Sequence, residues 1–285
     1  MSIKQKVLLM GEAGAGKSTA GLSYPGVEQI VWGSTEETTS EGFKGRTDIL
    51  KPVKFQWRDC ITEAEHTAIA KIMASGDELS QDKMIAPIHD KARARAVSKL
   101  FKYLDQLYHD VKAGKRPELK TVMLDNFSPL SQDIMVYTLA LHGDEISEKE
   151  SFKIWDKFYF YCDKVFDLMN AIDTHAIVTC HVAMALDEEV ASKVPFFEQT
   201  KVMSKKDWQP FVTGKYKFRI KSKFDYAFFL YNEEELGKPM QYYAELSGLG
   251  KGRIDPFDGN GKIKIPKGNF YQFINDALNK QQGGK

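Results

Sequence analysis

Cysteine is scarce in this chain of 285 residues, and the three that occur, Cys60, Cys162 and Cys180, lie far apart. Their odd number and the lack of any C-x-x-C pair argue against a disulfide framework and against a structural zinc site. No apolar run approaches the roughly 20 residues that a membrane-spanning helix needs, and the stretch before the first motif is too short for a signal peptide. We therefore expect a cytoplasmic protein with no membrane partner.

An excess of charge of either sign is also missing, because 40 Lys and Arg residues face 39 Asp and Glu residues. The net charge of +1 gives no indication of a nucleic-acid partner, so a polyanion site would have to be a local patch. Hydrophobic residues make up 42% of the chain, which is enough for a folded core. The length suits one large α/β domain, or one domain with a sizeable insertion.

Short apolar runs alternate with helical patterns along the chain. The runs that predict strands are 7–10, 29–32, 54–57, 121–124, 176–179, 226–231 and 240–246. The patterns that predict helices are 17–23, 62–74, 89–112, 129–141 and 151–171. This alternation predicts an α/β fold, with a mostly parallel sheet flanked by helices. We expect one domain over 1–280, with a helical insertion at about 60–113, a basic loop or hairpin at about 182–223, and a flexible tail from 281.

A complete G-x-x-x-x-G-K-S motif follows the first apolar run. Glycine permits positive φ and lets backbone N–H groups point inward at phosphate oxygens, while the following helix adds its positive N-terminal end. In such a loop the lysine reaches the β- and γ-phosphates and the hydroxyl of the last residue ligates Mg²⁺. The motif predicts ATP and Mg²⁺ as cofactors. The predicted phosphate-binding residues are Gly11, Glu12, Ala13, Gly14, Ala15, Gly16, Lys17, Ser18 and Thr19.

Asp125 follows the apolar run 121–124, as a Walker B aspartate does. At that position its carboxylate would lie beside Ser18 and hold Mg²⁺, usually through water. The alternative is an aspartate near the start of the next helix that acts only as a cap, since Asn126 and Ser128 also lie there as capping residues. Ser18 and Asp125 are the metal ligands that we expect.

Hydrolysis also needs a group that orients or deprotonates water. Glu36 and Glu37 follow the second predicted strand, so either could do this, although each is equally consistent with a solvated loop carboxylate. His181 ends the fourth buried run at the same edge. It could contact the γ-phosphate, or be a partly buried histidine with its hydrogen bonds satisfied.

These motifs, taken in order, resemble the RecA-like ATPase core, particularly the phage-encoded single-domain proteins of recombination and annealing. Residues 31–36 resemble the strand that ends in Asp-x-Glu, with Ser34 in place of the Asp. Residues 122–126 resemble the Walker B strand, and 177–181 resemble the strand that ends in a polar switch residue. The resemblance implies that Glu36, rather than Glu37, is the catalytic base and that His181 is the switch. It also implies a ring or filament of identical subunits, in the host cytoplasm if the protein is phage-encoded.

A late basic turn, 251–257, is similar to the Lys-x-Lys-x-x-x-Pro-Phe stretch of RecA, with a shorter gap before the proline. In RecA the two cations reach the ATP of the neighbouring subunit. By resemblance, Lys251 and Arg253 would take these roles, as arginine fingers do. The other interpretation is an ordinary basic turn.

The segment 193–223 contains nine basic residues against two acidic ones, a local balance of +7, with aromatic residues between them. Cations that follow a phosphate backbone, with aromatic stacking platforms, are typical of single-strand binding. The sequence therefore predicts single-stranded DNA as a partner, and a single-strand-binding protein as a further one. The residues expected to contact DNA are Lys201, Lys205, Lys206, Trp208, Lys215, Lys217 and Arg219. The alternative is an antiparallel strand over 215–223 with its charges in water.

The function that combines these features is a DNA-dependent ATPase of RecA type in phage recombination, annealing or replication. One alternative is a P-loop small-molecule kinase, although no Arg-rich lid is evident in the sequence. Another is a nucleotide-gated interaction module with little hydrolysis, for which Ser34 leaves room.

Overall fold

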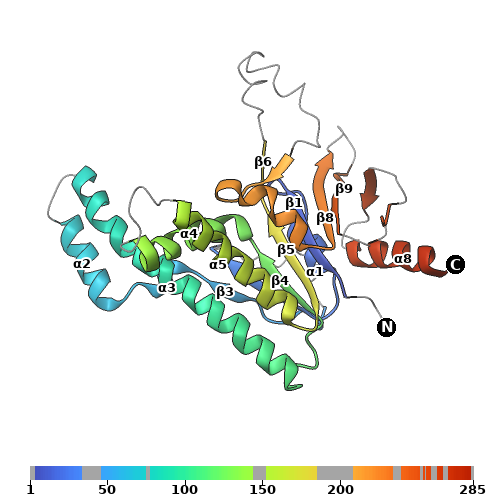
Figure 1. Cartoon of the computed structure of the whole chain (residues 1–285), viewed down its shortest axis with the longest axis horizontal. Coiled ribbons are helices and arrows are strands. Elements are labelled where there is room, and N and C mark those ends of the chain that lie inside the picture. The colour runs from blue at the N-terminus through green and yellow to red at the C-terminus, as the bar shows by residue number, and fades with distance from the viewer. Residues whose placement is uncertain are drawn as a thin grey trace, which may run out of the picture.

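A sheet of eight strands runs through the middle of the computed structural model, in the order β10-β9-β8-β1-β5-β4-β2-β3 (Figure 1). The structure describes residues 4–33, 46–74, 78–143, 152–184, 208–233, 239–250, 253, 255–257, 262–265 and 269–283. The strands of the sheet are β1 (Lys6–Gly11), β2 (Val27–Trp32), β3 (Val53–Phe55), β4 (Thr121–Asp125), β5 (His175–Cys180), β8 (Tyr226–Glu233), β9 (Gln241–Leu249) and β10 (Lys262–Ile265).

The six strands from β8 to β3 in that order are parallel to their neighbours. At the other margin, β9 pairs antiparallel with both β8 and β10. The carboxyl ends of the parallel strands therefore meet at one edge of the sheet. The expected α/β fold with a mostly parallel, helix-flanked sheet is confirmed. The seven apolar runs predicted as strands correspond to β1, β2, β3, β4, β5, β8 and β9, and β10 is an additional strand at the margin of the sheet.

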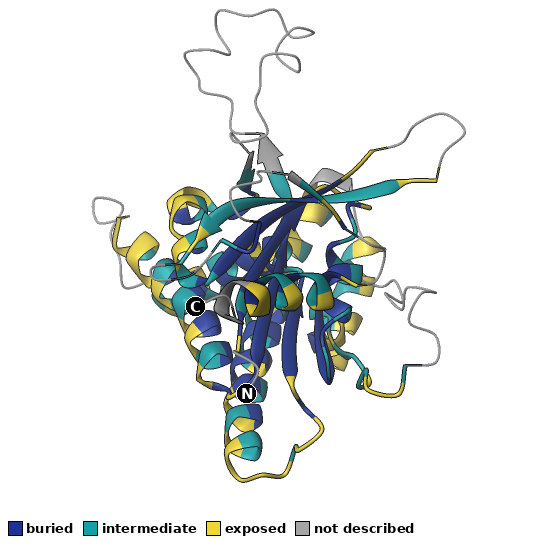
Figure 2. Ribbon diagram, turned by 90° about the vertical axis from the view of Figure 1, so that its right-hand side faces the viewer, coloured by how far each residue is buried: buried dark blue, intermediate teal, exposed yellow. Residues whose placement is uncertain are grey.

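Helices cover both faces of the sheet. On one face, α3 (Glu78–Lys112), α4 (Phe127–His142) and α5 (Phe152–Ala171) pack against one another (Figure 1). On the other face lie α1 (Lys17–Leu22) and α8 (Phe270–Gly283). Figure 2 shows the strands as a buried band between these layers.

Two hydrophobic cores follow from the alternation of side chains along each strand. In β1, Leu8 and Met10 belong to the core under α3, α4 and α5, whereas Val7 and Leu9 belong to the core under α1 and α8. All four side chains are fully buried. A strand that is apolar on both faces reads as a continuous run, which is why β1 is recognisable in the sequence.

The helical arm formed by α2 (Glu63–Met73) and the first half of α3 extends beyond the sheet at the left of Figure 1. The helix α3 begins at Glu78, before the predicted start at His89, and continues through Pro87. A proline inside a helix removes one hydrogen bond and crowds the carbonyl oxygen four residues before it, yet α3 continues through this position and packs against α2. None of the described helices is long and apolar enough to span a membrane.

The strand expected as an alternative over 215–223 is absent. The segment consists of two 3₁₀ helices, η6 (Gly214–Phe218) and η7 (Ile220–Lys223), after a small hairpin of β6 (Val182–Met184) and β7 (Trp208–Pro210). Tyr216 and Ile220 are both fully buried, whereas Phe218 between them is 64% exposed, so burial in this segment does not follow the two-residue alternation of a strand. The C-terminal helix α8 was not expected, and it runs to Gly283, into the predicted flexible tail.

Candidate nucleotide-binding site

Four polar segments meet at the carboxyl edge of the sheet. The glycine-rich loop follows β1, Asp125 ends β4, His181 follows β5, and Gly33 follows β2. The strand registers align them, because Met10 lies beside Cys180 and Val31 beside Asp125. The fold thus brings the predicted phosphate loop, metal ligand and switch residue to a common edge.

The glycine-rich loop has a backbone that only glycine adopts easily. Gly14 and Gly16 have φ of 76° and 84°, in the left-handed region. At Gly11 an added Cβ would lie 2.4 Å from the carbonyl oxygen of Leu230 on β8, so no side chain fits there. The loop is therefore shaped by glycine at the positions that the motif requires.

Lys17 is 7% exposed and its ammonium group lies within the loop. Its Nζ donates hydrogen bonds to the carbonyl oxygens of Gly11 (3.0 Å) and Glu12 (2.6 Å). Burial lowers the pKa of Lys17, while the nearby carboxylate of Asp125 acts in the opposite direction. A phosphate chain in the loop would replace these carbonyl partners with stronger, charge-assisted ones.

Asp125 is 8% exposed and accepts three side-chain hydrogen bonds. Oδ2 accepts from Ser18 Oγ (2.7 Å) and Gln29 Nε2 (2.9 Å), and Oδ1 accepts from Thr179 Oγ1 (2.6 Å). The capping interpretation of Asp125 is wrong, because Asn126 caps α4 by accepting from the backbone N–H of Ser128. The pair of Ser18 and Asp125 is thus in place as predicted.

Gln29 and Thr179 are members of the site that sequence reasoning missed. Both lie in apolar strands and are 3% and 0% exposed. A buried polar side chain in an apolar strand must find a partner, so these two residues could have been singled out as the groups that hold Asp125.

His181 lies beside the loop and is half-buried. Its backbone N–H donates to Ser128 Oγ at 2.9 Å, but its imidazole makes no hydrogen bond to any described residue. Burial and the positive charge of Lys17 lower the pKa of His181, against the opposing effect of Asp125. The imidazole is therefore neutral at neutral pH and available to a ligand.

A cavity of about 380 Å³ connects these groups. Its lining includes the glycine-rich loop, Lys17, Ser18, Asp125 and His181, and Trp32 and Gly33 form the wall at the end of β2. The Trp32 indole is fixed by a hydrogen bond of 2.9 Å to the buried carboxylate of Asp133 on α4. Burial raises the pKa of Asp133, and the N–H of Trp32 and the charge of Arg93 counteract that rise.

The residues of this cavity fit a magnesium–triphosphate group. They supply an ammonium for the phosphates, and a hydroxyl and a carboxylate 2.7 Å apart for the metal. Among the described residues there is no group of three or more His, Cys, Asp and Glu side chains that could hold a metal. A phosphate-bound Mg²⁺ does not need one, because phosphates and waters fill most of its coordination sphere.

Some of the predicted residues cannot be placed at this edge. Glu36, Glu37 and Lys251 lie outside the described residues. Arg253 lies at the opposite edge of the sheet, where its Nε donates to Asp225 Oδ1 at 2.9 Å, just before β8. Within one chain it is therefore far from the glycine-rich loop, so a role in hydrolysis would require a neighbouring subunit.

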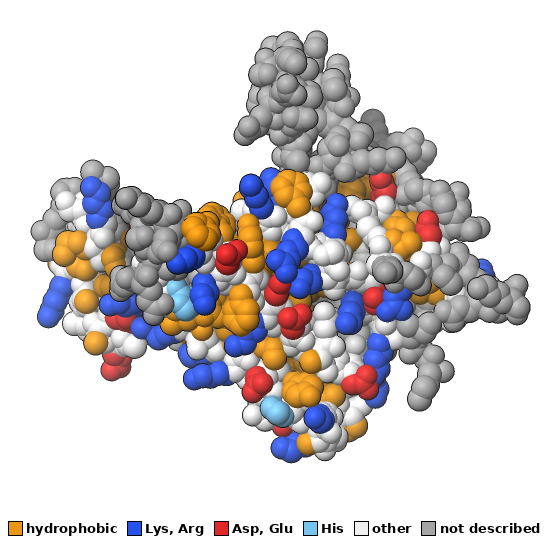
Figure 3. All heavy atoms as spheres, viewed as in Figure 1, with side chains coloured by type: hydrophobic (Ala, Val, Ile, Leu, Met, Phe, Trp, Pro, Cys, Tyr) orange, Lys and Arg blue, Asp and Glu red, His pale blue; other side chains and the backbone are white. Residues whose placement is uncertain are grey.

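Part of the predicted DNA-contacting set forms an exposed surface. We call it the η6 surface and define it as Trp155, Phe211, Lys215, Lys217 and Phe218. Phe211 and Phe218 are 50% and 64% exposed, and Lys217 Nζ lies 5.1 Å from the centre of the Phe218 ring. Figure 3 shows hydrophobic and basic side chains side by side over η6 and α5.

Other basic residues of that stretch are engaged or not described. Arg219 donates to Asp163 Oδ2 at 2.8 Å, and Lys223 pairs with the same carboxylate at 2.9 Å. Lys201, Lys205 and Lys206 lie outside the described residues, as does the side chain of Trp208.

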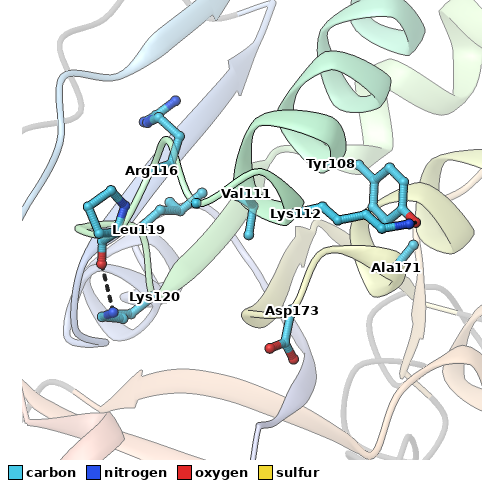
Figure 4. Close-up of a pocket in the computed structure, with 10 residues that line it drawn as sticks. Tyr108, Val111, Lys112, Arg116, Leu119, Lys120, Ala171 and Asp173 are labelled. Carbon is cyan, nitrogen blue, oxygen red and sulfur yellow. Dashed lines mark hydrogen bonds between the residues drawn. The ribbon is translucent and has the colours of Figure 1, made fainter.

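A larger cavity, of about 500 Å³, lies at the amino edge of the sheet, between the ends of α3 and α5 and the segment before β4 (Figure 4). Its cations are engaged. Lys112 Nζ donates to the Tyr108 hydroxyl at 3.4 Å, Lys120 Nζ donates to the Pro117 carbonyl, and Arg116 pairs with Glu28 and Glu118. None of the predicted site residues lines it. The candidate site is therefore the smaller cavity at the carboxyl edge.

A comparison of the chain with models of protein families found no match, and a comparison with curated proteins found no similar sequence.

Proposed function

We propose that this protein binds ATP with Mg²⁺ at the carboxyl edge of the sheet and hydrolyses it to ADP and phosphate. The observation that carries the proposal is the Ser18–Asp125 pair at 2.7 Å, beside a complete glycine-rich phosphate motif. A chance glycine-rich turn has no reason to have a buried carboxylate from another strand next to its final hydroxyl.

The residues of the site have different roles in the proposed reaction. The backbone N–H groups of the loop and Lys17 hold the β- and γ-phosphates, which fixes the γ-phosphorus for attack by water. Ser18 and Asp125 would hold Mg²⁺, which neutralises charge that develops on the phosphate oxygens. The bond between the γ-phosphorus and the bridging oxygen breaks, and the water proton passes to a base. Glu36 is our candidate for that base, by the resemblance to RecA-like proteins.

We further propose that the core is RecA-like and that single-stranded DNA stimulates hydrolysis. Support comes from the contacts that join the nucleotide site to the η6 surface. The carbonyl of His181 accepts from the N–H of Phe211 at 2.7 Å, and Ser131 Oγ accepts from the N–H of Thr213 at 3.2 Å. His181 donates to Ser128 on the same helix as Ser131. A shift of His181 toward a γ-phosphate would therefore move the segment that carries Phe211.

The test is ATP turnover with and without single-stranded DNA, at several salt concentrations. We expect turnover that DNA raises and that salt lowers, since cation–phosphate contacts weaken as salt rises. Lys17→Ala should abolish turnover. Tight ATP binding without turnover in any condition would instead support a nucleotide-gated module, and a phosphorylated acceptor beside ADP would support a kinase.

A further inference from the structure

The hairpin of β8 and β9 extends past the phosphate loop on the side away from β5. Asn232 on β8 and Tyr242 on β9 lie directly opposite each other in this hairpin. Asn232 Nδ2 donates to the carbonyl oxygen of Gly14 at 3.2 Å, which joins the hairpin to the loop. Tyr242 is thereby positioned next to the residues that would hold the phosphates.

The ring of Tyr242 packs against the backbone of Gly16. A Cβ added at Gly16 would lie 3.1 Å from Cδ1 and 3.2 Å from Cε1 of this ring. A side chain at position 16 would therefore crowd this ring. The ring of Tyr242 thus lies directly beside the glycine-rich loop.

None of the described aromatic residues stacks on the ring of Tyr242. Its neighbour Tyr243, on the opposite face of β9, stacks on Tyr231 with ring centres 5.5 Å apart and donates to Gln241. With the residues that the structure describes, Tyr242 forms no such ring contact or side-chain hydrogen bond, and it is only half-buried. One part of the ring therefore remains available to a ligand.

The order of the strands decides which part of a nucleotide would meet this ring. The metal ligand Asp125 and His181 lie on the side of β1 where β5 and β4 follow, whereas β8 and β9 lie on the other side. The γ-phosphate must lie with the metal and the switch residue. The nucleoside at the other end of the phosphate chain then leaves the loop toward β9.

We propose that Tyr242 is the platform on which the base of the bound nucleotide stacks. This inference rests on the proposed nucleotide binding and adds a residue that determines affinity for the nucleoside. A flat aromatic ring recognises a base through its π face, and a purine offers more area than a pyrimidine. Tyr242 adds stacking energy for the base, while the loop binds the triphosphate regardless of base.

The test compares the affinity of the full chain for ATP with its affinity for inorganic tripolyphosphate, both with Mg²⁺, by calorimetry. Base stacking is worth about 1–3 kcal/mol by alanine substitution, so Tyr242→Ala should weaken ATP binding about 5- to 150-fold. Binding of tripolyphosphate should stay within about twofold, because the loop is unchanged. Tyr242→Phe retains the ring and should bind ATP as the wild type does.

Tyr243→Ala is the matched control, since it removes the same side chain from the other face of the same strand. It should leave the ratio of the two affinities unchanged. The platform is refuted if Tyr242→Ala weakens both ligands equally, or neither. Failure of the wild-type protein to bind either ligand would overturn the proposed function itself, and the platform with it.

Discussion

Replacement of Asp125 separates the structural role of its carboxylate from its proposed role as a metal ligand. Asp125→Ala removes the acceptor of three hydrogen bonds, whereas Asp125→Asn retains the shape of the side chain, removes its charge and replaces one acceptor oxygen by a donor. The hydroxyls of Ser18 and Thr179 can rotate, and the amide of Gln29 can turn over, so all three partners can adapt to an asparagine. The two variants therefore have different expected costs.

The expected loss of stability follows from the burial of the donors. Thr179 is 0% exposed and Gln29 is 3% exposed, so neither finds water when its acceptor is removed. Each buried donor without a partner costs about 1–3 kcal/mol, and Ser18 at the open edge can bond to water instead. Asp125→Ala should thus lose about 2–6 kcal/mol, while Asp125→Asn should lose about 1 kcal/mol.

The assay is urea unfolding of both variants and the wild type, with ATP alone and with ATP plus Mg²⁺. A ligand at 100 times its Kd stabilises the folded state by about 2.7 kcal/mol. We expect the wild type to gain more from ATP with Mg²⁺ than from ATP alone. Asp125→Asn should fold well and yet lose this additional gain.

Two results would refute this reasoning. If Asp125→Asn gains as much from Mg²⁺ as the wild type, the carboxylate does not hold the metal. If Asp125→Ala is as stable as the wild type, the three hydrogen bonds do not matter to the fold.

Three further predictions concern other parts of the chain. Gly16→Ala should abolish ATP binding, measured by calorimetry, because φ of 84° is strained for alanine and an added Cβ would lie only 3.1 Å from the ring of Tyr242. Burial, with a contribution from nearby Lys4, lowers the pKa of His175 to about 4. Since the unfolded chain takes up this proton near pH 6.5, stability should fall by about 2 kcal/mol between pH 7 and pH 4.5, and less in His175→Asn. Replacing both Lys215 and Lys217 by Ala should reduce the slope of log K against log salt for single-stranded DNA by about 1.4.

Much of the fold could be predicted because its parallel strands are buried on both faces. The strand β1 reads as an apolar run for this reason, and the motif that follows it fixes the place of the glycine-rich loop. Asp125 was accessible to the same reasoning, since it ends such a run. The spacing of polar residues after buried strands is thus enough to assemble Lys17, Ser18, Asp125 and His181 at one edge.

The remainder depends on contacts between segments that are distant in sequence. Tyr242 approaches Gly16 only because β9 pairs with β8 and β8 lies beside β1. The alternation of Lys and aromatic residues over 215–223 suits a strand, but Tyr216 is held by its hydrogen bond to Asp163 on α5 and by ring contacts with Phe158 and Phe166. Tertiary packing of this kind overrides the strand preference of the local sequence. The residues near Tyr216 in the sequence give no indication of these distant contacts.

Arg253 gives the sharpest remaining test, because the structure offers it a second role. Its guanidinium is paired with Asp225, whose Oδ2 also accepts from the N–H of Lys6 at 3.0 Å, so the pair joins the turn after β9 to the starts of β8 and β1. With side chains 34% and 14% exposed, such a pair is worth about 1 kcal/mol.

We expect Arg253→Ala and Asp225→Ala to destabilise the fold, with the double variant losing less than the sum of the two. Turnover per folded molecule should be unaffected if this ion pair is the whole role of Arg253. Loss of turnover in Arg253→Ala at an unchanged melting temperature, restored by mixing with Lys17→Ala protein, would contradict that and would show that the arginine serves the site of a neighbouring subunit.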